Sequence, residues 1–186
     1  MITKQYLLPI TFIASICSIG LTACGGSSPK TIDIMHKFDG AWKKACEYDA
    51  DKSSAEQTIS TIDGNSLKAL YTQYITQDCS GTARVTINIV ADIQYKGEHV
   101  TGDCKAEKVD TTITEVTVNG QKIPLDQIIG LLSNVDILSS PQYDIICIDE
   151  NGALRSGDSR KEEHDASAPE KRPIAMDMSG EGGIKQ

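Results

Sequence analysis

The six cysteines are the residues of this chain whose chemistry is most definite. Cys17 and Cys24 lie near the N-terminus. The other four are spread through the body of the chain, at Cys46, Cys79, Cys104 and Cys147. A metal site would need closely spaced ligands such as C-x-x-C, and no such pair occurs. An even number of well-separated cysteines in an oxidising compartment predicts two disulfides. Four cysteines allow three pairings, of which we favour the nearest-neighbour one, Cys46–Cys79 with Cys104–Cys147.

The histidines and carboxylates do not converge on a second site. His36, His99 and His164 are far apart in the sequence, and none has another histidine at ligand spacing. The run Glu162–Asp165 combines acid, base and ligand types, but such a charge run is far more often solvated surface. The chain has no G-x-S-x-G motif and no phosphate-binding loop. We therefore predict no catalytic residue, no metal site and no enzymatic activity.

The chain opens with an export signal. Residues 6–20, YLLPITFIASICSIG, are apolar and follow Lys4. The run is shorter than the ~20 residues of a membrane-spanning helix and fits the apolar core of a secretory signal. The next residues, 21–24, read LTAC and resemble the lipobox of bacterial lipoproteins. The resemblance implies that residues 1–23 are a signal peptide that is removed. It also implies a diacylglyceryl group and an N-acyl chain on Cys24, the only non-protein groups we expect.

Residues 24–36 then form a lipidated flexible tether, which includes GGSSPK. In lipoproteins of diderm bacteria, an aspartate after the lipidated cysteine often means retention in the inner membrane, whereas this chain has Gly25. The resemblance therefore implies an outer-membrane lipoprotein that faces the periplasm or the cell surface. The alternative is an ordinary secreted protein that is cut nearby and keeps a free cysteine.

The charge balance excludes one class of partner. The chain has 26 acidic and 18 basic residues, for a net charge of −8 at pH 7. Nucleic-acid-binding proteins carry basic patches, so we expect no nucleic acid partner. The length of 186 residues suits one domain.

Residues 37–158 have the pattern of a β domain. The clearest strand is Arg84–Lys96, in which apolar side chains alternate with polar ones and which Gly97 ends. Hairpin turns are predicted at Asp63-Gly64, at Asn119-Gly120 and at Asn151-Gly152. The apolar face switches between Ile113 and Val116, which predicts a bulge near Thr114.

Two other segments have different patterns. Residues 123–135, IPLDQIIGLLSNV, have the apolar spacing of one short helix that Pro124 precedes, with an apolar connection across the barrel mouth as the alternative. Residues 159–186 are predicted to be a charged loop and a disordered C-terminal tail. Within them, residues 173–178, PIAMDM, could pair briefly as an edge strand. Residues 179–186, SGEGGIKQ, should fray.

A family resemblance enters at FDGAWKKAC, residues 38–46. Gly40 and Trp42 match the G-x-W that opens the first strand of lipocalin-like barrels, where the tryptophan plugs the closed end. The chain also resembles small lipoproteins of gamma-proteobacteria of the Acinetobacter and Psychrobacter type, which have no settled activity. Shared motifs include LRSGD at 154–158 and EKRP at 170–173. Ser156 replaces the usual aromatic residue, and SGEGGIKQ replaces an aromatic-rich closing strand.

These observations predict a mainly β fold, either an antiparallel meander or a lipocalin-like barrel, whose closure they leave open. Two functions fit it. We favour an interaction or structural domain at the outer membrane, with an envelope protein or a glycan as partner. The alternative is a lipocalin-like carrier of a small apolar ligand, and an envelope enzyme or enzyme inhibitor is a third, weaker candidate. A closed barrel with an open apolar cavity would favour the carrier, whereas an exposed apolar patch would favour a partner.

Overall fold

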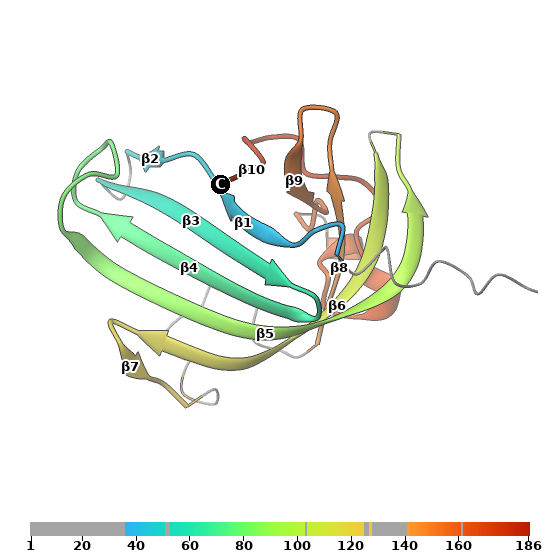
Figure 1. Ribbon diagram of the computed structural model, residues 1–186, viewed down its shortest axis with the longest axis horizontal. Coiled ribbons are helices and arrows are strands. Elements are labelled where there is room, and N and C mark those ends of the chain that lie inside the picture. The colour runs from blue at the N-terminus through green and yellow to red at the C-terminus, as the bar shows by residue number, and fades with distance from the viewer. Residues whose placement is uncertain (1–35, 51–52, 103, 125–126, 128–140, 161) are drawn as a thin grey trace, which may run out of the picture.

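The computed structural model describes residues 36–50, 53–102, 104–124, 127, 141–160 and 162–186 (Figure 1). The signal peptide, Cys24 and nearly all of the tether and of the predicted helix lie outside the described residues. The strands are β1 (Gly40–Lys43), β2 (Glu47–Asp49), β3 (Ser54–Asp63), β4 (Ser66–Tyr74), β5 (Ala83–Val100), β6 (Lys105–Val118), β7 (Gln121–Lys122), β8 (Gln142–Ile148), β9 (Ala153–Ser156) and β10 (Gly183–Lys185). Two short 3₁₀ helices, η2 (Glu162–His164) and η3 (Pro169–Lys171), also lie within the described part of the chain.

The strands form a closed antiparallel barrel of eight strands. Around the wall the order is β1, β10, β9, β8, β6, β5, β4 and β3, and β3 pairs again with β1. Strands β2 and β7 extend the sheet outside this ring, on β3 and β6. The mainly β prediction is confirmed, and its open alternatives resolve to a closed barrel.

The three predicted hairpin turns are confirmed. Strand β3 joins β4 through Gly64 and Asn65, and Asp63 pairs with Ser66. Asn119 and Gly120 both have positive φ, +49° and +80°, as a type I′ turn between two strands requires. The third turn, around Asn151 and Gly152, joins β8 to β9.

Strands β5 and β6 bend at two irregularities. The predicted bulge is confirmed, because Val90 pairs with Glu115 and Ala91 pairs with Ile113, which leaves Thr114 as the extra residue. The prediction that Gly97 ends the long strand is wrong. Gly97 has a φ of +97° and lies in a second register shift, after which β5 continues to Val100. A glycine inside a strand thus marks a bulge here and not a terminus.

Trp42 lies in the main core cluster at one end of the barrel. Trp42 is 2% exposed, and its Nε1 donates a hydrogen bond to the carbonyl of Phe38 over 2.8 Å. Phe38 is fully buried and stacks on Tyr95 with ring centroids 6.1 Å apart. Gly40 begins β1 with a φ of +135°, which L-residues rarely adopt, and lies against the side chain of Lys185.

The prediction that residues 179–186 fray as a disordered tail is wrong. Gly183–Lys185 form β10, which pairs with β1 on one side and with β9 on the other (Figure 1). The glycines suit this seam because it is crowded. A Cβ at Gly182 would lie 2.8 Å from the Cβ of Ala153 and 2.9 Å from the carbonyl oxygen of Leu154. The glycines of this segment, which in the sequence indicate flexibility, here permit close packing of the strands.

Residues between β9 and β10 cover the outer face of β6 and β8. Met176 is buried against Ala106, Ile145 and Cys147, and it forms an isolated bridge with Gly157. The predicted brief pairing within residues 173–178 is therefore confirmed.

The two late sequence motifs meet in the same region. Gly157, from LRSGD, lies so close to Pro173, from EKRP, that a Cβ there would overlap the proline ring. Arg172 Nη1 donates to the carbonyl oxygen of Val109 over 2.6 Å and also to that of Asp144, and Nη2 pairs with Asp110. The EKRP segment is thereby fixed to the strands β6 and β8.

Both predicted disulfides are present with the nearest-neighbour pairing. Cys46–Cys79 joins the segment before β2 to the loop between β4 and β5, 33 residues apart. Cys104–Cys147 joins the start of β6 to β8, 43 residues apart. Each bond links segments that are far apart in sequence.

Candidate ligand-binding site

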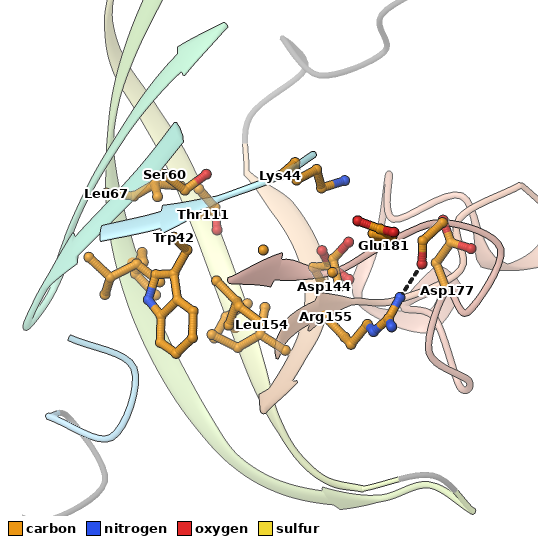
Figure 2. A pocket seen from close by; sticks show the side chains of 18 of the residues that line it. Trp42, Lys44, Ser60, Leu67, Thr111, Asp144, Leu154, Arg155, Asp177 and Glu181 are labelled. Carbon is orange, nitrogen blue, oxygen red and sulfur yellow. Dashed lines mark hydrogen bonds between the residues drawn. The ribbon is translucent and has the colours of Figure 1, made fainter. Parts of the chain in front are cut away.

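The barrel encloses a cavity of about 510 Å³ that opens to one side (Figure 2). Its apolar wall consists of Trp42, Ile62, Leu67, Ile93, Val109, Ile146 and Leu154. Several of these residues also belong to the main core cluster, so the cavity begins where the core around Phe38 and Trp42 ends. A volume between 300 and 1,000 Å³ is typical of small-molecule sites.

Strand periodicity places these side chains inside the barrel. Alternate residues of a strand share one face, so Val109 and Thr111 of β6 both line the cavity. On β8 the inward positions are Gln142, Asp144 and Ile146. The alternate positions Ile145 and Cys147 point outward, where Met176 covers them. The inner face of β8 is therefore polar at Gln142 and Asp144 and apolar at Ile146.

The mouth of the cavity is polar and charged. It includes Lys44 and Glu47 from the N-terminal part, and Asp177, Ser179 and Glu181 from the segment before β10. Figure 2 shows Asp144, Asp177 and Glu181 on the side of the cavity away from Trp42. The cavity thus has an apolar end and a charged end.

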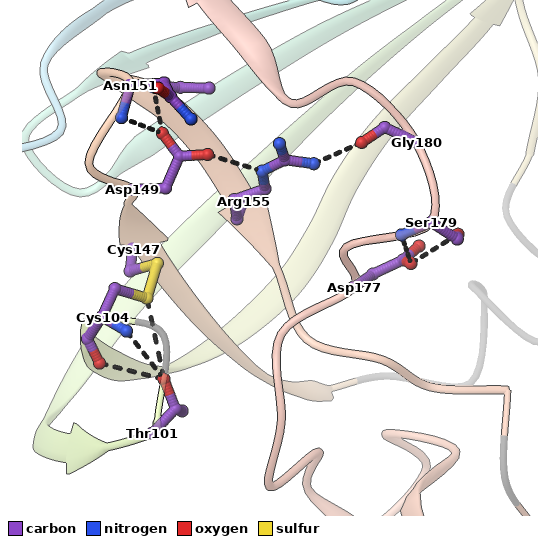
Figure 3. A network of polar contacts seen from close by, with 10 residues as sticks. Thr101, Cys104, Cys147, Asp149, Asn151, Arg155, Asp177, Ser179 and Gly180 are labelled. Carbon is purple, nitrogen blue, oxygen red and sulfur yellow. Dashed lines mark hydrogen bonds and ion pairs between the residues drawn. A yellow bond between two sulfur atoms is a disulfide. The ribbon is translucent and has the colours of Figure 1, made fainter.

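Arg155 holds the segment before β10 in place (Figure 3). Its Nε donates to Asp149 Oδ2 over 2.9 Å, and its Nη1 donates to the carbonyl of Gly180. Asp149 Oδ1 also accepts from the backbone N–H groups of Asn151 and Ala153, each over 2.9 Å. These contacts lower the pKa of Asp149, with the backbone hydrogen bond from Ala153 as the largest cause.

Asp144 is the carboxylate in the cavity wall. Its Oδ1 accepts the backbone N–H of Ile145 over 2.7 Å and that of Gly157 over 3.0 Å. Burial raises the pKa of Asp144 to about 6, although both N–H groups and the positive charge of Arg172 act in the opposite direction. Two backbone donors on one oxygen fix the direction in which the carboxyl group points.

Glu107 is a second carboxylate inside the barrel, and it does not line the cavity. It is 4% exposed, and its Oε2 has no hydrogen-bond partner among the described residues. Burial raises its pKa, opposed by the charge of Lys37 and reinforced by that of Glu98. Glu107 pairs in the sheet with Ile146, which belongs to the apolar wall of the cavity. Glu107 therefore lies inside the barrel next to that apolar wall.

The three histidines lie in separate parts of the structure. His36 Nδ1 contacts Asp39 Oδ2 at 2.6 Å, His99 Nε2 lies 3.4 Å from the carbonyl oxygen of Ile174, and His164 lies in η2. The neighbouring Asp165 accepts hydrogen bonds from Ser167 and pairs with Lys171. Within the described ranges, no group of three His, Cys, Asp or Glu side chains is placed to hold a metal ion.

Of Gly40, Trp42 and the four disulfide cysteines, Trp42 alone lines the cavity, and Leu154–Ser156 of the LRSGD motif line it as well. Gly40 lies at the closed end, and the four cysteines brace the wall. Sequence reasoning missed Asp144 and Arg155. A signal for Asp144 exists, because Gln142 and Asp144 share a face with the apolar Ile146 and Ile148 in the alternating stretch QYDIICI. Polar residues on an inward face indicate a cavity wall in place of a filled core.

Neither a family model, nor a curated protein, nor a solved structure matches this chain. In the described part of the chain, no helix is long and apolar enough to cross a membrane.

Proposed function

We propose that this protein binds a small amphiphilic molecule inside its barrel and acts as a carrier or receptor without catalysing a reaction. The observation that carries the proposal is the cavity of about 510 Å³ within a closed barrel, with an apolar floor at Trp42 and a polar mouth. Apolar walls with a few placed polar groups are typical of small-molecule sites. This arrangement favours the carrier over the interaction domain that the sequence alone slightly favours.

The proposed function includes a lipid anchor on Cys24. The lipobox at residues 21–24 supports a mature chain held on the outer membrane by acyl groups on Cys24, and several acyl chains give stable anchoring. A Gly/Ser tether would let the barrel stand off the bilayer. We expect Cys24→Ser to abolish palmitate labelling and to release or mislocalise the protein. Unchanged membrane association of the variant would contradict the anchor.

The binding proposal is tested on the mature chain, residues 24–186, exported to an oxidising periplasm as the unlipidated Cys24→Ser form so that no detergent competes for the cavity. Native mass spectrometry first asks whether a small molecule copurifies. Trp42 is the chain's single tryptophan and lies in the cavity floor, so its fluorescence reports on added 1-octanol. Saturable binding of 1-octanol is the expected result.

A matched pair of variants locates the binding. Ser60 lines the cavity, whereas its neighbour Thr61 on β3 is exposed on the outer face. Ser60→Phe should fill part of the cavity and weaken octanol binding at least about tenfold, while Thr61→Phe should bind as the parent does. Equal binding by the two variants, or no saturable binding by the parent, would contradict the proposed function.

A further inference from the structure

We propose that the bound amphiphile is a cation, with its apolar part against Trp42 and a protonated amine or quaternary ammonium beside Asp144. This inference rests on the proposed function and names its ligand class. It is carried by the charges of the cavity, by the fixed orientation of the Asp144 carboxylate and by the separation of that carboxylate from the apolar floor.

The described residues that line the cavity include four carboxylates and two cations. The carboxylates are Glu47, Asp144, Asp177 and Glu181, and the cations are Lys44 and Arg155. The site is therefore acidic before any pairing is considered. A cleft lined mainly by one sign of charge concentrates ligands of the opposite sign.

Pairing makes the imbalance larger. Arg155 already pairs with Asp149, a carboxylate that does not line the cavity. Asp177 is compensated in part by Arg160, whose Nη2 lies 3.4 Å from Oδ1. Glu47 and Glu181 form no ion pair with any residue that the structure describes. Among the described lining residues, Lys44 is thus the one cation without a described ion-pair partner, whereas the carboxylates Glu47, Asp144 and Glu181 also have none.

Asp144 provides an oriented acceptor. Its Oδ1 is occupied by the N–H groups of Ile145 and Gly157, whereas its Oδ2 forms no hydrogen bond with a described residue. The nearby Arg172 does not neutralise the carboxylate by direct contact, because its guanidinium donates to two backbone carbonyls and to Asp110. A partly buried carboxylate without a charge partner is unfavourable, and a cationic ligand would relieve this cost.

The two ends of the cavity suit the two parts of such a ligand. Asp144 pairs across the sheet with Val109, which belongs to the apolar wall, so the carboxylate lies at the border of that wall. Trp42 and Leu154 lie together on the far side (Figure 2). An ammonium group with an alkyl chain would match this order of polar and apolar surfaces, whereas an alkyl carboxylate would meet like charge.

The test compares three probes of equal chain length on the mature, unlipidated protein at neutral pH. They are octylammonium chloride, 1-octanol and sodium octanoate, each titrated against Trp42 fluorescence. We expect octylammonium to bind about tenfold more tightly than 1-octanol and octanoate to bind least tightly. We also expect Asp144→Asn to remove most of the preference, so that the affinities for octylammonium and 1-octanol become similar. Asparagine keeps an oxygen that accepts from Ile145 and Gly157, which favours a folded variant.

Asp92→Asn is the matched control, because Asp92 is exposed on β5 and does not line the cavity. Equal binding of the three probes by the parent would overturn the cation inference and leave the proposed function standing. Tighter binding of octanoate would overturn it as well. Failure of all three probes to bind would overturn both. A preference for octylammonium that survives Asp144→Asn would show that Asp144 has only a structural role at Gly157 and would overturn its assignment as the cation partner.

Discussion

The indole Nε1 of Trp42 donates a hydrogen bond to the backbone carbonyl of Phe38 over 2.8 Å, four residues earlier in the chain. This bond satisfies the one polar group of a buried ring and places the ring at the boundary between the closed end and the cavity. Trp42 therefore links the stability of the barrel to the shape of its binding site.

Trp42→Ala should destabilise the protein by about 3–5 kcal/mol, because it removes a large, 2% exposed side chain from the core. The free energy of unfolding can be measured by urea denaturation followed by far-UV circular dichroism, a signal that does not depend on the tryptophan. A loss below about 1 kcal/mol would mean that the ring contributes little to the core and would contradict its role as the plug.

Gly182→Ala should destabilise the seam between β9 and β10. The added methyl group would lie 2.9 Å from the backbone carbonyl oxygen of Leu154, which cannot move without disturbing the sheet. Overpacking of this kind costs about 1–3 kcal/mol. Gly180→Ala is the control in the same segment, since its nearest contact would be an ordinary 3.5 Å to Glu47 Oε1. Equal stability of the two variants would contradict the inference that the backbone is crowded around Gly182.

Asp144 should make the unliganded protein less stable as the pH rises. Its pKa is about 6 in the folded protein, above the ordinary value of 3.8, so its contribution is fully present below about pH 4 and is lost as pH rises through about 6. Other carboxyl groups, such as Asp149, have lowered pKa values and act in the opposite sense. The difference in unfolding free energy between the parent and Asp144→Asn, measured from pH 4 to 8, isolates the effect. A difference independent of pH would contradict it.

Protonation of Asp144 should also change the preference of the cavity for a cationic ligand. Between about pH 7 and pH 5 the Asp144 carboxyl gains a proton, so the preference for octylammonium over 1-octanol should shrink as the pH falls. Arg172 is the charged neighbour that opposes this protonation, and Arg172→Met should move the midpoint of the change to higher pH. Fluorescence titrations at several pH values measure the midpoint directly. A preference that stays constant over this range would argue against Asp144 as the partner.

Loss of either disulfide should cost about 4 kcal/mol in the chain-entropy model, because each bond closes a loop of some tens of residues, with separations of 33 and 43. Paired replacement by alanine, Cys46/Cys79 in one variant and Cys104/Cys147 in the other, measures each contribution without leaving a free thiol. Peptide mapping of the parent under non-reducing conditions should recover both linkages. Free thiols at any of the four positions would contradict the pairing.

Local signals made much of the fold predictable. Asn119-Gly120 supplies two residues that tolerate positive φ, and the change of apolar face around Thr114 follows directly from a bulge in a strand of period two. The nearest-neighbour disulfides were a preference among three pairings. The turns and the bulge depend on a few adjacent residues, so they can be predicted from the sequence.

The seam and the site depend on contacts that a sequence does not display. Gly182 and Gly183 indicate flexibility when considered alone, and only the proximity of Ala153, Leu154 and Trp42 explains why small residues are needed there. The alternation in QYDIICI places Asp144 on the inward face of a strand, but it does not show which groups surround the carboxylate. Its importance comes from Gly157, whose N–H it accepts, and from the empty volume beside it.

Closure of the barrel also dictates an order of events during biogenesis. Strand β1 lies near the start of the described chain, and its partner β10 lies at the far end, with Trp42 opposite Lys185. Contacts between such distant segments form slowly and leave open strand edges until they form. The β1 edge that β10 covers must therefore stay unpaired until residues 183–185 reach it. Until then the chain is an unclosed sheet with open edges that can pair with other chains, and any product that stops short of β10 would stay in that state.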